Sequence, residues 1–243
     1  MGAARAMTTA TVPGFQPSVH GFPYPNSWPP GPTVRLGPIR TPILGLGDAS
    51  AGLCGGMVMI VRDLFEAGIP MPAQPRPANG TARFSAIVRR QVESLDWLRV
   101  PLHYYDLQAF RPDPPTPVAA LLHREPPRVV SIRREWPLIR ADIDAGHPSP
   151  LGLVRLSGLS PWGLTRNHQV LAFGYEETGR QIRVRVYDPN HPGRDDVELR
   201  AEIAPDAARP WWERVQLAQS TGEPLLGFFR QPYPAPGSLR AWR

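Results

Sequence analysis

The sequence contains a single cysteine, Cys54, within the segment "AGLCGGM" (residues 51–57). A helical pattern of apolar residues starts directly after it, which predicts that Cys54 lies in the first turn of a helix. The free N–H groups and partial positive charge of a helix N-terminus favour the thiolate, the nucleophilic form of cysteine. Neighbouring glycines, among them Gly55, would let a substrate approach the sulfur. The alternative is that Cys54 is a small apolar residue of the core.

A histidine and an aspartate are predicted to meet at one end of a β-hairpin. The segments "NHQVLAFGY" (167–175) and "RQIRVRVYD" (180–188) have the alternation of strands, and "EETG" between them is a turn. His168 opens the first strand and Asp188 closes the second, so antiparallel pairing makes their side chains neighbours. An imidazole can then act as base and acid for a thiol, with the carboxylate orienting its ring.

His168 and Asp188 could each have a purely structural role instead. His168 could be a hydrogen-bonded histidine at a strand end, and the "DPN" sequence at Asp188 favours a turn by itself. Asn190, two residues on, is an alternative orienting group. A metal site built from His168, Asp188 and His191 would have no recognised ligand spacing, so we expect neither a metal nor another cofactor.

The three segments "LCGGM", "NHQVLAFGY" and "VRVYDPN" resemble the papain-like cysteine peptidase superfamily, and most closely its C39-like peptidases. The resemblance covers roughly residues 44 to 190. It implies an α+β, papain-like fold, in which an N-terminal helical part with a central Cys-bearing helix packs against a C-terminal antiparallel sheet. It also implies that Cys54 is the nucleophile, His168 the base and Asp188 the orienting residue.

One position departs from the pattern of that family. The family usually carries a glutamine six residues before the cysteine, whose amide donates to the oxyanion, and this sequence has Asp48 there. An ionised carboxylate cannot donate and would repel the developing charge, although Asp48 could cap the following helix. Asn26 and the backbone N–H of Cys54 are the substitute donors that we can name, and Gly55 and Asn190 are the other residues expected to support the site.

The rest of the chain predicts how these residues are positioned. Residues 1–43 form a proline-rich arm, whose aromatic residues indicate that it packs on a body spanning 44–243. Within the body, a helical half covers about 44–146 and a sheet half about 147–243. Helices are expected at 55–67, 82–98 and from Ser131 onward with a bend or new start at Pro137, and further strands at 150–156 and 224–233.

Composition excludes several classes of protein. All 27 basic residues are arginine, and they are scattered without a run of like charge, so we expect no nucleic-acid partner despite the net charge of +6. A single cysteine excludes an internal disulfide. We find no secretory signal and no apolar stretch long enough for a membrane span, which predicts a cytoplasmic protein that does not enter a membrane.

These observations predict a thiol-dependent hydrolase that cleaves a peptide or amide bond through a thioester at Cys54 and needs no cofactor. The expected partner is a peptide or acyl substrate, and the oligomeric state stays open. Two alternatives use the same residues. The protein could be an acyltransferase or transglutaminase-like enzyme, or a papain-like binding or scaffold protein that has lost turnover, which Asp48 would favour.

Overall fold

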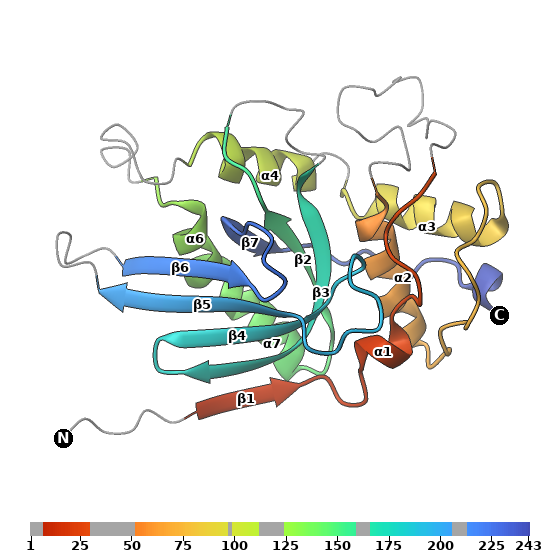
Figure 1. Ribbon diagram of the computed structural model, residues 1–243, viewed down its shortest axis with the longest axis horizontal. Helices are drawn as coiled ribbons and strands as arrows, with labels where there is room; N and C mark the ends of the chain where they lie inside the picture. Colours follow the sequence, from red (N-terminus) through yellow and green to blue (C-terminus); the bar gives the residue numbers. More distant parts are fainter. Residues whose placement is uncertain (1–6, 30–51, 97–98, 112–123, 159–165, 206–212) are drawn as a thin grey trace.

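The structure is a computed structural model that describes residues 7–29, 52–96, 99–111, 124–158, 166–205 and 213–243 (Figure 1). None of the helices in these ranges is long and apolar enough to cross a membrane. The helical elements are α1 (Pro17–His20), α2 (Cys54–Glu66), α3 (Ala82–Glu93), α4 (Arg99–Ala109), α6 (Pro127–Val130), η2 (Ser131–Glu135), α7 (Trp136–Asp144) and η4 (Arg240–Trp242). The strands are β1 (Met7–Thr11), β2 (Ser149–Val154), β3 (His168–Thr178), β4 (Gln181–Tyr187), β5 (Glu198–Pro205), β6 (Glu213–Gln219) and β7 (Gly227–Arg230).

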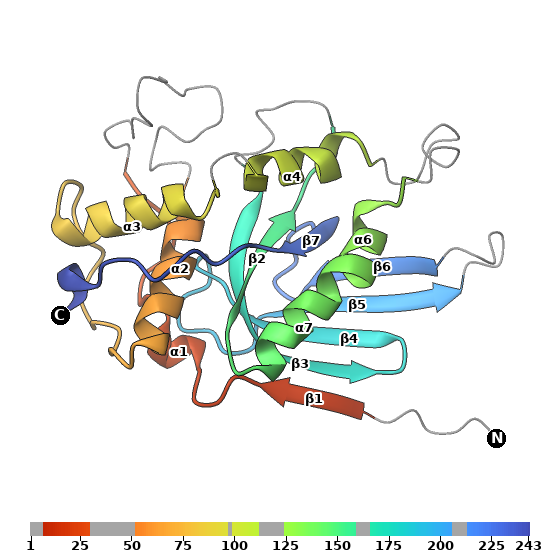
Figure 2. The ribbon, with the colours of Figure 1, turned by 180° about the vertical axis from the view of Figure 1, so that it is seen from behind.

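The seven strands form one antiparallel sheet in the order β6-β5-β4-β3-β2-β7, with β1 paired to the far end of β3. The sheet curls into a nearly closed, barrel-like shape, and α2 and α3 lie beyond one end of it (Figures 1 and 2). The expected papain-like α+β fold is therefore wrong. The described chain has a barrel-like sheet and few helices, and its N-terminal strand belongs to the sheet that was expected only after residue 147.

The helical segment α6–η2–α7 lies across the gap between the two edge strands, β6 and β7 (Figure 2). Its side chains bond to the edge backbones. Arg128 donates to the carbonyl of Val215 on β6 at 3.1 Å, and Ser131 Oγ accepts from the N–H of Phe228 on β7 at 2.7 Å. Because unpaired edges attract other strands, these contacts take the place of the missing strand pairing.

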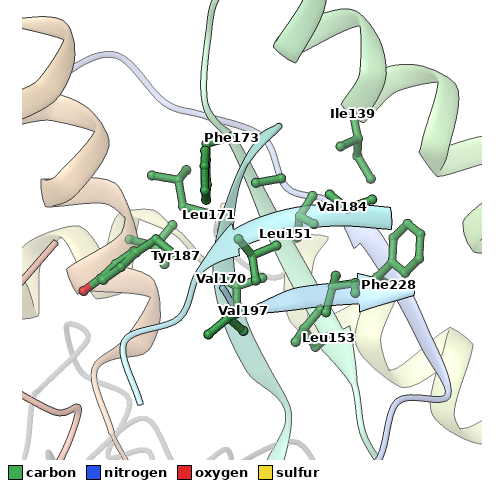
Figure 3. Packing of buried hydrophobic residues seen from close by; sticks show 14 of the residues in the cluster. Ile139, Leu151, Leu153, Val170, Leu171, Phe173, Val184, Tyr187, Val197 and Phe228 are labelled. Atoms are coloured by element: carbon green, nitrogen blue, oxygen red, sulfur yellow. The ribbon is translucent and has the colours of Figure 1, made fainter. Parts of the chain in front are cut away.

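Buried apolar residues fill the inside of the curved sheet (Figure 3). They come from alternate positions of the strands and from the inner face of α7, and include Ile139, Leu151, Leu153, Val170, Val184 and Phe228. The same core extends to α2, which packs against α3 and β3. Gly56 permits this close approach of the helices, because a Cβ there would lie 2.1 Å from the carbonyl oxygen of Ile87 on α3.

Local patterns predicted several elements well. The first two helices appear as α2 and α3, and the hairpin appears as β3 and β4. The helical stretch from Ser131 does not stop at Pro137. It contains a wider, π-helical turn just before the proline, in which the N–H of Trp136 donates to the carbonyl of Ser131, five residues back. Three strands, β1, β5 and β6, and the helix α4 were not predicted.

The N-terminal segment packs on the body through its aromatic side chains. Phe15, Phe22 and Trp28 are all at most 5% exposed and belong to the main core. The segment also crosses the loop after β4, since the N–H of Asn26 donates to the carbonyl of Pro189 at 2.9 Å. Residues 22–28 thereby reach the ends of α2 and β4, where the candidate site lies.

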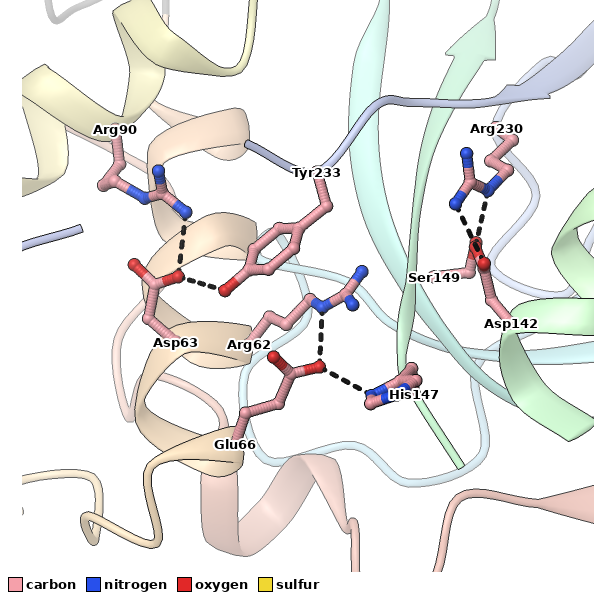
Figure 4. Close-up of polar contacts among 9 residues, drawn as sticks. All are labelled: Arg62, Asp63, Glu66, Arg90, Asp142, His147, Ser149, Arg230 and Tyr233. Atoms are coloured by element: carbon pink, nitrogen blue, oxygen red, sulfur yellow. Dashed lines mark hydrogen bonds and ion pairs between the residues drawn. The ribbon is translucent and has the colours of Figure 1, made fainter. Parts of the chain in front are cut away.

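A buried ion pair fastens the C-terminal segment to α2 and α3 (Figure 4). Asp63 accepts from Arg90 at 2.8 Å, and both side chains are at most 2% exposed. The Tyr233 hydroxyl and the N–H of Gly237 also donate to Asp63. The guanidinium of Arg62 lies 3.7 Å from the centroid of the Tyr233 ring. The tail after β7 is thus held by the two helices that carry and support Cys54.

Replacing Asp63 by alanine should destabilise the fold, because the buried Arg90 guanidinium then keeps only Glu93 as an ion-pair partner and the Tyr233 hydroxyl loses its acceptor. We expect the free energy of unfolding in urea to fall by about 1–3 kcal/mol. The matched control is Asp196→Ala, which removes an exposed ion pair with Arg194 and should leave stability unchanged. Equal unfolding midpoints for both variants would show that the buried pair contributes nothing to the attachment of the tail.

Candidate functional site

Cys54 is the first residue of α2 and is a half-buried residue. The next N–H groups of the helix are occupied around it: Gly56 donates to Gln91 Oε1 at 2.9 Å, and Met57 donates to the carbonyl of Leu53. Gly55 cannot be replaced without a shift, since a Cβ would lie 2.1 Å from Gln169 Oε1. The helix start is therefore held against α3 and β3.

His168 and Asp188 occupy neighbouring ends of the β3–β4 hairpin, and both are buried. His168 Nε2 lies 2.6 Å from Asp188 Oδ1. Asp188 accepts two more hydrogen bonds, from the N–H of Asn190 at 2.8 Å and from Gln219 Nε2 at 2.9 Å. A buried carboxylate with three donors is stabilised as the anion. The hairpin thus delivers an ionised aspartate to the imidazole.

The structure brings Cys54 to the same imidazole, close enough that each side chain shifts the pKa of the other. Because Nε2 faces Asp188, the nitrogen left for the sulfur is Nδ1. The backbone N–H groups of Gln169 and Gly55 also lower the pKa of the thiol. The three residues singled out from the sequence therefore form one row, Cys54–His168–Asp188, although 114 positions separate the first two in the chain.

The charges of this row favour a thiolate and an imidazolium. Burial alone would raise the pKa of the Cys54 thiol, but His168 and the two backbone N–H groups lower it below its usual value. Burial disfavours a charged ring, yet the Asp188 carboxylate and the Cys54 sulfur raise the pKa of His168 to about 10. Burial likewise opposes ionisation of Asp188, but His168 and the Asn190 N–H lower its pKa to about 2. At neutral pH the sulfur is thus paired with a charged ring.

Asn26 connects the loop before Cys54 with the loop after Asp188. Its Oδ1 accepts from the N–H of Leu53 at 2.7 Å, and its Nδ2 lies 3.4 Å from Asn190 Oδ1. Gly52 has a φ of +96°, and a Cβ there would lie 2.7 Å from Asn26 Nδ2. The amide of Asn26 therefore stands beside the backbone that leads into the nucleophile.

The structure places only some of the other residues that the sequence predicted at the site. Asp48 lies outside the described residues. The backbone N–H of Asn190 donates to Asp188, and Asp188 is the residue hydrogen-bonded to the imidazole. His191 pairs with Glu223 at 2.8 Å. In the part of the chain that the structure describes, no group of three or more His, Cys, Asp or Glu residues could hold a metal ion.

Sequence reasoning missed two residues that support the row. The Tyr104 hydroxyl donates to the backbone carbonyl of His168 at 2.8 Å. Gln219 binds Asp188 from β6, a strand that was not predicted. Neither residue carries a local signal, because each comes from an element whose place in the fold depends on long-range packing.

Comparisons with models of protein families, with curated proteins and with solved structures found no match for this chain. The resemblance to C39-like peptidases stays a prediction.

Alkylation of Cys54 by iodoacetamide should be fast at pH 6.5. A free thiol with a pKa near 8.5 is only about 1% ionised at that pH, whereas an ion-paired thiolate reacts there. His168→Ala removes the imidazolium and should slow alkylation at pH 6.5 by about tenfold or more. His147→Ala, which changes an exposed histidine far from the sulfur in sequence, is the control. Slow labelling that His168→Ala leaves unchanged would show that Cys54 is a structural thiol.

Proposed function

We propose that this protein is a thiol-dependent hydrolase that cleaves a peptide or amide bond through a thioester on Cys54. The observation that supports the proposal is the row Cys54–His168–Asp188, in which His168 is hydrogen-bonded to the buried Asp188 carboxylate at 2.6 Å and lowers the pKa of the Cys54 thiol. This arrangement contains a nucleophile, a base and an orienting group within reach of one another. It needs no cofactor for acyl transfer.

The reaction proceeds in two halves. The Cys54 thiolate attacks the substrate carbonyl carbon, and the C–S bond forms as the carbonyl oxygen becomes an oxyanion. His168 then gives its Nδ1 proton to the leaving amine, the C–N bond breaks, and a thioester remains. Neutral His168 next takes a proton from water as the water attacks the thioester. The C–S bond breaks, the acid leaves, and the thiolate and imidazolium are restored.

We propose two donors for the oxyanion. The N–H of Cys54 lies in the first turn of α2, where an N–H has no acceptor within the helix. The Asn26 amide stands beside Gly52, next to the same turn. Asn26 Oδ1 accepts from the N–H of Leu53, and Nδ2 directs one hydrogen at Asn190 Oδ1, which leaves its second hydrogen for the oxyanion. Asn26 thus replaces the expected glutamine.

A second candidate reaction uses the same first half. An amine or thiol could take the place of water and accept the acyl group, because nothing in the three side chains selects water. The identity of the acceptor then decides between hydrolase and acyltransferase, and product analysis with an added amine distinguishes them.

The proposal predicts a covalent acyl-enzyme. Incubation with p-nitrophenyl acetate should release a burst of p-nitrophenolate and leave an acetyl group on Cys54, detected by intact mass and peptide mapping. Cys54→Ala should abolish both the burst and the adduct, and Asp188→Ala should slow them because the imidazole loses its orienting carboxylate. If the native protein forms no acetyl adduct at Cys54, the site does not perform acyl transfer and the binding-protein alternative is favoured.

Asn26→Asp tests the oxyanion donor. Aspartate keeps an acceptor for the N–H of Leu53 but cannot donate, so hydrolysis of p-nitrophenyl acetate should fall by about 10²–10³-fold. Alkylation of Cys54 by iodoacetamide forms no oxyanion and should fall much less. Equal losses in both reactions would mean that Asn26 only holds the loop in place.

A further inference from the structure

Gln219 binds the far side of Asp188. Its Nε2 lies 2.9 Å from Asp188 Oδ2, while His168 and the Asn190 N–H occupy Oδ1. Gln219 ends β6, an edge strand three places from β3 in the sheet, and its side chain is buried. Both carboxylate oxygens are thus held, each from a different element.

The chemistry of the neighbours fixes the direction of the Gln219 amide. Arg155 donates to Gln219 Oε1 at 3.1 Å, and a guanidinium can only donate. Ionised Asp188 can only accept, so the NH₂ group must face it. If the amide flipped, both hydrogen bonds would become repulsive contacts. The partners of Gln219 therefore allow only one of the two flip states of its side-chain amide.

Arg155 closes this set of contacts into a ring. Its backbone N–H donates to Asn167 Oδ1 at 3.1 Å, and Asn167 directly precedes His168. The ring therefore runs from His168 to Asp188, then to Gln219, to Arg155, to Asn167 and back to His168. It joins the ends of β2, β3, β4 and β6, so that the imidazole and its carboxylate are braced from two sides.

We propose that Gln219, oriented by Arg155, is a positioning residue that fixes the Asp188 carboxylate against His168 and thereby holds the ring in line with Cys54. The proposal rests on the proposed thiol chemistry. Without Gln219, Oδ2 would have no donor from β6 and the carboxylate could rotate about its Cβ–Cγ bond. Because a hydrogen bond to a buried charge is among the stronger ones, its loss should be measurable in the step that uses His168 as a base.

The test follows the acetyl-enzyme made with p-nitrophenyl acetate and measures its loss by intact mass. Gln219→Met is nearly isosteric and cannot donate, so deacylation should slow about 10- to 100-fold. Gln216→Met, at an exposed position on the same strand, is the matched control and should deacylate at the native rate. Arg155→Met should act in the same direction with a smaller effect, because it leaves the Gln219 amide present but unoriented.

A double-mutant cycle separates positioning from general stability. Gln219→Met added to Asp188→Ala should have no further effect on deacylation, since the carboxylate it positions is gone. Urea unfolding of each variant checks that it is folded under the assay conditions. Native deacylation rates in Gln219→Met, or an equal slowing in the Asp188→Ala background, would overturn the role of Gln219. Failure of the native protein to form an acetyl-enzyme would overturn the proposed function instead.

Discussion

The hydrogen bond between His168 and Asp188 places a charge pair almost completely inside the protein, with exposures of 5% and 0% for the two side chains. Removing two ions from water is unfavourable unless further hydrogen bonds satisfy them. Asp188 receives such bonds from the Asn190 N–H and from Gln219. The second partner of His168 is the Cys54 sulfur. The segments that carry these groups must therefore stay in place for the pair to persist.

The curved sheet satisfies this requirement. In a flat sheet the end of β6 would lie about two strand spacings, or roughly 10 Å, from β4, which Asp188 directly follows. The curling of the sheet, together with the loop after β4, lets Gln219 reach Asp188 from the edge. The helical segment α6–η2–α7 bonds to both edge strands, β6 and β7, and so helps to hold the sheet in its curled shape. The same curled shape brings the end of β6 to the site.

The parts of the site that the sequence predicted are those with local causes. A helix start at Cys54 follows from apolar spacing, and the proximity of His168 and Asp188 follows from a short turn between two alternating strands. The path of the sheet has no such local cause. Strands β1, β5 and β6 pair over long distances or carry weak patterns, so neither Gln219 nor the barrel-like shape was found. A resemblance in three short motifs also misled the fold assignment, because one arrangement of nucleophile, base and carboxylate recurs on unrelated folds.

The ionised row also links the site to the stability of the fold. The pKa of Asp188 is about 2 in the folded protein and 3.8 ordinarily, so its ionisation stabilises the fold above about pH 4, an effect lost as pH falls through 2. His168 has the opposite sign. Its pKa of about 10 exceeds the ordinary 6.5, so its protonation stabilises the fold fully below pH 6.5, an effect lost as pH rises through 10. Unfolding breaks the contacts that hold both charges, and the thiol then returns to its ordinary pKa. The reactive form of Cys54 is therefore a property of the whole fold, since His168 comes from the hairpin, Gln219 supports Asp188 from the edge strand β6, and Asn26 holds the N–H of Leu53 from the N-terminal segment.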